Sequence, residues 1–169
     1  MIKVICIGKL KEKSLVSLVD DYLCRILPYT KISIDELKDF PNYDDDSSNR
    51  LSIEKESKSI LDKISNDDYV ILLDLRGKYY SSIEVSQLID QASTYGSKNI
   101  VFIIGRSLGV DNNVLKRANA VWKLSNNTFP HGIVRVLVLE QIYRSYRILN
   151  NRKLQYQVVH FLKKNYQYQ

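Results

Sequence analysis

The sequence predicts a single α/β domain built on a mainly parallel sheet. Five short apolar runs with strand-like composition alternate with five longer segments of helical periodicity, and this alternation is typical of strands joined by helical crossovers. The chain has 169 residues, of which 44% are hydrophobic. That length is enough for one well-packed core and too short for two comfortable domains.

The five strand-like runs differ in how apolar they are. The third and fourth are apolar at almost every position, which is typical of strands covered by helices on both faces. We therefore expect both to be central in the sheet. The predicted strands are residues 2–7, 31–37, 69–75, 99–105 and 120–125.

The segments between the strands repeat their apolar residues at helical spacing. Ser81 and Glu84 have the Ser-x-x-Glu spacing of a capping box, which satisfies free amides at a helix start. Residues 39–49 have turn composition and no periodicity, which predicts a mobile surface loop. The predicted helices are residues 11–27, 50–65, 83–95, 111–118 and 133–150.

Composition narrows the class of protein. No apolar run approaches the roughly 20 residues of a membrane span. The first residues carry charges where a signal peptide has its apolar core, so we expect a cytoplasmic protein with no membrane partner. Cys6 and Cys24 fit neither a disulfide framework nor metal-ligand spacing, and we expect two buried thiols and no metal.

The formal charge of +6 and a pI near 9.2 favour a polyanionic partner. The segment of residues 135–164 is rich in basic side chains and contains a single acidic residue, Glu140. Aromatic and basic residues interleave beyond residue 151, which suits base stacking and phosphate contact, although a subunit contact is a competing explanation. The stacking candidates are Tyr156, His160, Phe161, Tyr166 and Tyr168.

Three loops are candidates for ligand binding, because ligands of parallel sheets bind beyond the carboxyl ends of the strands. They are residues 73–78, 104–109 and 124–132. Gly105 and Gly109 allow either a tight turn or close approach of a ligand to the backbone. His131 lies at a helix start, where the dipole disfavours a positive charge, so a neutral structural histidine is favoured over a proton shuttle.

The segment from residue 133 has a polar stripe that contains Glu140, Arg144 and Arg147. Glu140 and Arg144 are spaced to form an ion pair on one helix face. A solvated face of a packed helix and a surface for RNA both explain the stripe, and the pattern alone leaves both open.

Four stretches together carry a resemblance to a known family: "KVICIGKLKEK", "LDLRGK", "VFIIGRSLG" and "TFPHGIVRVLVLEQIYRSYRIL". They resemble the bacterial ribosomal RNA large subunit methyltransferase H family of the SPOUT superfamily, over residues 2 to about 157. The resemblance implies an S-adenosylmethionine-dependent methyltransferase that modifies N3 of a pseudouridine in 23S rRNA on the assembled ribosome. It also implies a homodimer, a C-terminal trefoil knot, and no DNA partner. The methyltransferase domain would span residues 1–157, and residues 158–169 would form a basic and aromatic extension.

The family's site residues fall on named positions of this chain. The resemblance assigns catalysis to Arg144 and Tyr156 and identifies no general base. It places Arg144 in contact with RNA, and we expect the RNA-binding residues to be Arg106, Arg135, Arg144, Arg147, Tyr156 and Gln157. It assigns cofactor binding to Leu73, Gly105, Leu124, Ser125, Asn126, Asn127, Thr128 and Phe129.

Two positions depart from the family pattern. Gly105-Arg106 stands where the family has Gly-Gly, and Tyr156-Gln157 stands where it has Tyr-His. Three alternatives therefore stay open: a relative with a changed target nucleotide, a non-catalytic relative that binds ribosome or cofactor, and a generic α/β small-molecule binder.

Overall fold

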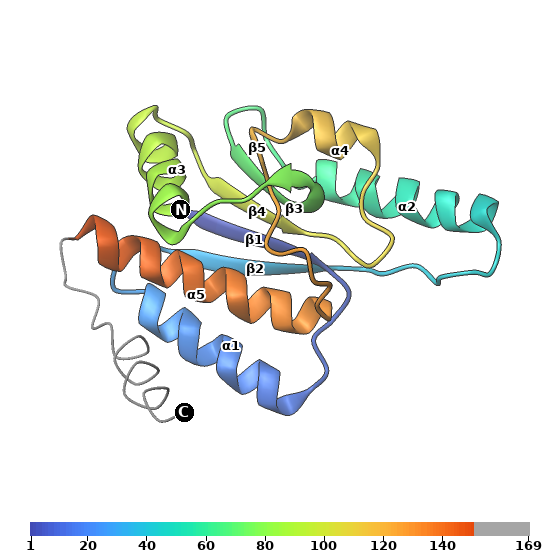
Figure 1. Cartoon of the computed structure of the whole chain (residues 1–169), viewed down its shortest axis with the longest axis horizontal. Coiled ribbons are helices and arrows are strands. Elements are labelled where there is room, and N and C mark those ends of the chain that lie inside the picture. The colour runs from blue at the N-terminus through green and yellow to red at the C-terminus, as the bar shows by residue number, and fades with distance from the viewer. Residues whose placement is uncertain (151–169) are drawn as a thin grey trace, which may run out of the picture.

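The computed structural model describes residues 1–150, in which five strands alternate with five helices (Figure 1). This order confirms the predicted alternation. In chain order the elements are β1 (Ile2–Ile7), α1 (Lys13–Ile26), β2 (Ile32–Leu37), α2 (Asp46–Leu61), β3 (Tyr69–Lys78), α3 (Ser82–Thr94), β4 (Ile100–Ile104), α4 (Asn112–Arg117), β5 (Ala120–Trp122) and α5 (His131–Leu149).

The strands form one sheet in the order β2-β1-β4-β3-β5, and every neighbouring pair is parallel. The expected fold class is confirmed, and β3 and β4 both lie in the interior of the sheet as predicted. The carboxyl ends of β3, β4 and β5 lie at the same edge of the sheet, so the loops that follow them can share one site. The trefoil knot stays a prediction from the resemblance.

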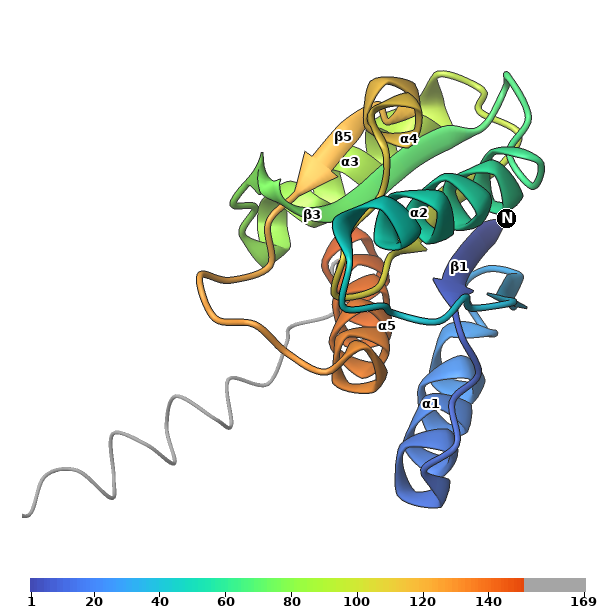
Figure 2. The same ribbon diagram turned by 90° about the vertical axis from the view of Figure 1, so that its right-hand side faces the viewer.

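Helices cover both faces of the sheet. Val4 and Phe102 belong to a core shared with α1, α3 and α5, whereas Ile5 and Ile103, their chain neighbours, belong to a core shared with α2 and α4. This alternation follows from the two-residue period of a strand. Figure 2 shows α2 and α4 together on one side of the strands and α5 with α1 on the other.

Helix α2 begins four residues before the predicted boundary. The Asp45 carboxylate accepts a hydrogen bond of 2.7 Å from the Ser48 amide and caps the helix at its N-terminus. The predicted mobile loop of residues 39–49 is therefore partly helical. Strand β5 is shorter than predicted and ends at Trp122, which leaves residues 123–130 free to form an irregular loop.

Strand β3 is longer than predicted and runs to Lys78, with a shift in its pairing to β5 after Leu73. Gly77 permits this extension, because a Cβ atom there would lie 2.4 Å from the Val121 carbonyl oxygen. The Lys123 amide then donates to the Lys78 carbonyl over 2.7 Å. The end of β3 is thus fixed against the chain that leaves β5.

Smaller expectations have mixed outcomes. The capping box of Ser81 and Glu84 is confirmed at the start of α3. Cys6 is buried as expected, but Cys24 is exposed, because it lies on the outer side of α1. Among the helices of residues 1–150, none is long and apolar enough to cross a membrane.

Candidate functional site

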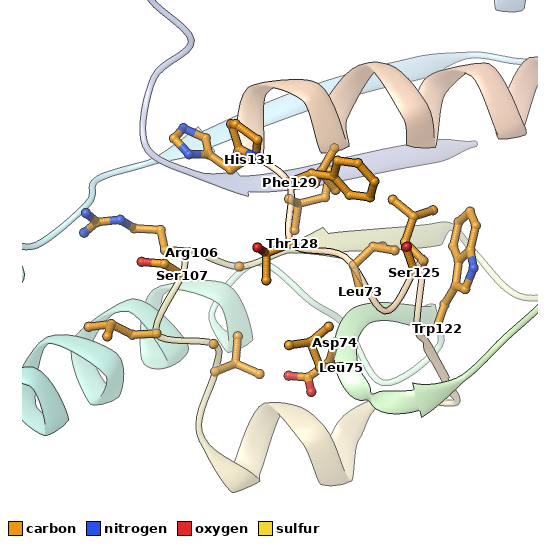
Figure 3. A pocket seen from close by; sticks show the side chains of 18 of the residues that line it. Leu73, Asp74, Leu75, Arg106, Ser107, Trp122, Ser125, Thr128, Phe129 and His131 are labelled. Carbon is orange, nitrogen blue, oxygen red and sulfur yellow. The ribbon is translucent and has the colours of Figure 1, made fainter.

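The three segments selected from the sequence line one pocket of about 600 Å³ at the carboxyl ends of β3, β4 and β5 (Figure 3). This volume lies within the usual range for small-molecule and cofactor sites. All but one of the expected cofactor-binding residues line it: Leu73, Gly105, Leu124, Ser125, Asn127, Thr128 and Phe129. The expectation of a loop at residues 73–78 was wrong, because β3 continues to Lys78.

Asn126 is the exception, because its side chain lies outside the pocket. Its side-chain oxygen Oδ1 accepts a hydrogen bond from the hydroxyl of Tyr79, the residue after β3. Within the same loop, the Asn127 amide donates to Ser125 Oγ over 3.0 Å. Asn126 therefore fixes the shape of the loop through Tyr79 and does not line the pocket.

Apolar side chains that the sequence analysis did not select form part of the pocket wall. Trp122 is 3% exposed and lines the pocket together with Ile104, and Val134 lines it from the first turns of α5. Trp122 stands in a predicted strand, where an apolar residue is expected in any case. In the structure Trp122 is the last residue of β5, and this position brings it to the pocket.

Asp74 and Arg76 form a second missed feature of the site. Arg76 donates to the Asp74 carboxylate over 2.8 Å and 2.7 Å through its side chain and over 2.9 Å through its backbone amide. The Asp74 side chain is 9% exposed. Burial alone would raise the pKa of Asp74, but the hydrogen bonds and positive charge of Arg76 lower it below its ordinary value.

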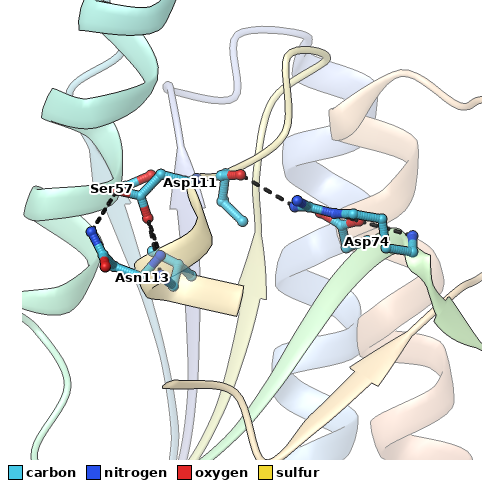
Figure 4. A network of polar contacts seen from close by, with 7 residues as sticks. Ser57, Asp74, Asp111 and Asn113 are labelled. Atoms are coloured by element: carbon cyan, nitrogen blue, oxygen red, sulfur yellow. Dashed lines mark hydrogen bonds and ion pairs between the residues drawn. The ribbon is translucent and has the colours of Figure 1, made fainter. Parts of the chain in front are cut away.

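Arg76 also reaches the loop after β4. Its Nη2 donates to the Val110 carbonyl oxygen over 3.2 Å, and the next amide, of Asp111, donates to Ser57 Oγ over 3.0 Å (Figure 4). The Asp111 carboxylate caps α4 by accepting from the amides of Asn113 and Val114. The rim of the pocket is thus fixed to β3 on one side and to α2 on the other.

The loop after β4 makes a tight turn at this rim. Gly109 has a φ of +77°, a conformation that favours glycine, and its amide donates to the Arg106 carbonyl over 2.9 Å. The tight turn that was one interpretation of the two glycines is confirmed, and the close approach of a ligand stays a prediction for the pocket that Gly105 and Gly109 line.

Arg106 does not project toward the centre of the pocket. Its Nη1 donates to the carbonyl oxygen of Phe40 and lies 3.2 Å from Oε1 of Glu56. Figure 3 shows the guanidinium extending away from Thr128. The long side chain at the family's second glycine position is therefore accommodated by partners in α2 and in the segment before it.

Arg135 corrects a prediction of RNA contact. Its side chain is 2% exposed, its Nη2 donates to the Gly8 carbonyl over 2.5 Å, and its Nη1 pairs with Glu36 over 2.5 Å. A guanidinium buried at the carboxyl ends of β1 and β2 has no surface to offer to RNA. Its role is structural, and it anchors the first half of α5 to the sheet.

Arg144 and Arg147 lie in the second half of α5. Arg144 pairs with Glu140 as predicted, with Nε to Oε1 at 2.9 Å. Arg147 donates to the Tyr143 hydroxyl over 3.0 Å and lies over its ring. At 1.5 Å per residue, Arg144 lies roughly 15 Å along the helix from Val134 of the pocket wall. Within one chain Arg144 is not brought to the pocket.

The remaining assignments divide between described and undescribed residues. His131 is exposed, begins α5 and lines the pocket mouth. Its expected structural role stays a prediction. Tyr156, Gln157 and the stacking candidates lie outside the described residues. Within residues 1–150, no group of three or more His, Cys, Asp or Glu side chains is placed to hold a metal ion.

The arrangement fits an organic ligand with both apolar and polar parts. Trp122, Leu73 and Phe129 supply apolar surface, and the backbone of residues 124–130 is free of sheet pairing and supplies amides and carbonyls. A Cβ atom at Gly105 would lie 3.2 Å from the Val110 side chain, so glycine lets the loop after β4 pack closely at the pocket. These features suit a nucleoside-like group.

Sequence comparison places the chain beside methyltransferases. A family model described as "Predicted SPOUT methyltransferase" matches residues 1–154. A protein of Clostridium botulinum (strain Alaska E43) named "Ribosomal RNA large subunit methyltransferase H" is 46% identical over 151 residues, which cover 88% of this chain and 95% of that protein. A protein of the same name from Bacillus thuringiensis is 44% identical over 149 residues, covering 87% and 94%.

Solved structures agree on the fold. A probable methylase family protein from Haemophilus influenzae aligns over 97% of this chain and 76% of its own, with a TM-score of 0.53 and 16% identity. At that identity the likeness shows the fold alone.

Proposed function

Since the chain belongs to the SPOUT methyltransferase family, we propose that its pocket binds S-adenosylmethionine and that it methylates N3 of a pseudouridine in large-subunit ribosomal RNA. The single observation that carries this proposal is the meeting of the last part of β3 with the loops after β4 and β5 in one pocket. These three segments contain the positions to which the resemblance assigns the cofactor.

The pocket residues fit this cofactor. When bound, S-adenosylmethionine supplies an electrophilic methyl group on a sulfonium. The backbone of residues 124–129 and of Gly105 would hydrogen-bond the purine and the ribose, and Leu73 and Trp122 would offer apolar surface to the flat ring. Tyr79 and Ser125 hold the 124–129 loop in shape from outside and from within.

Catalysis in such a site depends mainly on alignment of the target nitrogen with the methyl group. Positioning of two reactants can contribute about 7–11 kcal/mol to lowering a barrier. The target nitrogen must lose its proton, and a nearby guanidinium favours the anion. Arg144 is the proposed source of that positive charge, and Tyr156 remains a proposed catalytic residue.

Arg144 can act at the pocket only if two chains together form one site. The separation of roughly 15 Å along α5, at 1.5 Å per residue, keeps Arg144 away from the pocket of its own chain. A homodimer would let Arg144 of one protomer approach the pocket of the other. We therefore propose a homodimer with composite sites, in which Arg144 and Arg147 contact RNA.

The proposed place of action is the assembled ribosome in the cytoplasm. The net charge of +6 supports a polyanionic partner, as do the basic residues from 144 onward. The proposed domain boundary near residue 157 leaves a basic and aromatic extension of twelve residues, 158–169, as a candidate RNA contact. Gln157 does not supply the imidazole of the family's histidine, which favours a changed target nucleotide or a lost activity as the second candidate.

Transfer of labelled methyl from S-adenosylmethionine to ribosomes tests the proposal. The ribosomes come from a strain without its own enzyme of this family, and protein-free 23S rRNA serves as the comparison. We expect label in the large-subunit RNA of ribosomes and much less in free RNA. Cofactor and ribosome binding without transfer would support the non-catalytic relative, and no cofactor binding at millimolar concentration would refute the methyltransferase proposal.

A further inference from the structure

Arg106 closes a hydrogen-bonded ring around one peptide segment. Glu56 Oε1 accepts from the Phe40 amide over 2.9 Å, and Nη1 of Arg106 approaches the same Oε1 at 3.2 Å. The same Nη1 donates to the Phe40 carbonyl oxygen. Both polar groups of the Phe40 backbone are thus bound, one by Glu56 and the other by Arg106.

The ring is shielded from water. The Glu56 side chain is 5% exposed and that of Arg106 is 20% exposed. Charge-assisted hydrogen bonds between shielded groups are stronger and less screened by salt than those on the surface. The contact therefore has the burial and the geometry of a structural tie rather than of a surface ion pair.

The tie bears directly on the pocket rim. Arg106 and Gly105 line the pocket, and Arg106 begins the turn that Gly109 closes. Two further bonds hold the same loop, from Asp111 to Ser57 on α2 and from Arg76 to Val110. Of these three contacts, the Arg106 contact is the one nearest to Gly105.

We infer that Arg106 is a positioning residue for cofactor binding. Through its contacts with Glu56 and Phe40, Arg106 holds the 105–110 loop in its binding shape. This inference rests on the proposed function. It also gives a role to the arginine that stands where the family has its second glycine: the Arg106 side chain links the loop after β4 to Glu56 on α2. A guanidinium bound in this ring is not available to contact RNA. Loop positioning therefore replaces RNA contact as the proposed role of Arg106.

The expected effect follows from the population of the binding-competent loop. If loss of the tie leaves about one-tenth of the molecules in that shape, the apparent dissociation constant rises about tenfold. The turnover of the filled site changes little, because a bound cofactor orders the loop again. Arg106→Ala should therefore raise the KM for S-adenosylmethionine about tenfold and leave kcat within about twofold.

The test is a titration of the full chain with S-adenosylmethionine, monitored by the fluorescence of Trp122. It is carried out at a temperature at which circular dichroism shows that every variant is folded. The variants are Arg106→Ala, Glu56→Gln and the double substitution, with Arg106→Gln in reserve if Arg106→Ala does not fold. Arg50→Ala is the matched control, because Arg50 and Glu54 also lie 3.2 Å apart on α2 but are 82% and 51% exposed.

We expect a tenfold weaker affinity for Arg106→Ala, a clearly smaller effect of the same change in the Glu56→Gln background, and no change for Arg50→Ala. Hydrogen exchange of residues 105–110 without cofactor should also become faster. Wild-type affinity in Arg106→Ala, or unchanged exchange, would overturn the inference and leave the proposed function standing. A wild-type chain that binds no cofactor would instead overturn the proposed function, and the inference with it.

Discussion

Arg135 on α5 and Glu36 on β2 form an ion pair with 2.5 Å between Nη1 and Oε1, although 99 positions separate them in the chain. Glu36 also accepts from the Leu10 amide over 2.8 Å, and Arg135 donates to the Gly8 carbonyl. This cluster joins the start of α5, which borders the pocket, to β2 and to the loop after β1.

Replacement of Arg135 by alanine should destabilise the fold by about 3 kcal/mol, because removal of one partner from a buried pair typically costs 3–5 kcal/mol and Glu36 keeps partial solvent contact. Chemical denaturation measures the change. Arg25→Ala is the control, since Arg25 pairs with Asp21 on the exposed side of α1, and its loss should leave the stability nearly unchanged. Equal stability of the two variants would contradict a structural role for Arg135.

Acid should weaken the fold partly through Asp74. Its pKa is lowered in the folded state, so its contribution to stability is present above the ordinary pKa of an aspartate and is lost as the pH falls through the folded value. Asp74→Asn should be less stable than the wild type near neutral pH, and the difference should shrink below about pH 4. Urea midpoints across this range measure it, and a difference independent of pH would contradict the assignment.

The two cysteines should differ sharply in reactivity. Burial raises the pKa of Cys6 to about 12, and its side chain is 0% exposed, whereas Cys24 is exposed. A thiol reagent at neutral pH should label one cysteine in the native protein and both after denaturation. Cys24→Ser should abolish native labelling, and persistent labelling of that variant would show that the core around Cys6 opens.

The sequence contains a single tryptophan, and it lies at the pocket. Binding of S-adenosylmethionine should therefore change the fluorescence of Trp122. Phe129→Ala should weaken that binding about tenfold, because it removes an aromatic wall of the pocket. Tyr95→Ala changes an exposed aromatic side chain outside the pocket lining and provides a comparison. Unchanged affinity in Phe129→Ala would show that the cofactor lies elsewhere.

Arg144→Ala should leave cofactor affinity within about threefold and lower methyl transfer at least a hundredfold, as loss of an electrostatic contact to the transition state does. Binding and single-turnover transfer are measured on the same preparation. Glu140→Gln removes the negative charge that pairs with Arg144 while keeping the guanidinium, and it should cost less. A large loss of cofactor binding in Arg144→Ala would show that its role has been misplaced.

Sequence patterns predict those features of the molecule that local chemistry decides. Alternation of apolar runs predicted the parallel sheet, and the rule for carboxyl ends of strands selected the loops that contain Leu73, Gly105 and Phe129. Sequence patterns fail where a partner lies far away in the chain. Burial of Arg135 depends on Glu36, and the direction of Arg106 depends on Glu56, so no local pattern distinguishes these arginines from solvated ones.

Mass-spectrometric mapping of the methylated nucleotide tests the central claim most directly. The chain is incubated with S-adenosylmethionine and ribosomes that lack the modification, and the large-subunit RNA is digested and sequenced. We predict a single added methyl group on N3 of a pseudouridine, absent when Arg144→Ala replaces the wild type. A methyl group on another nucleotide, or on none while cofactor and ribosome both bind, would contradict it.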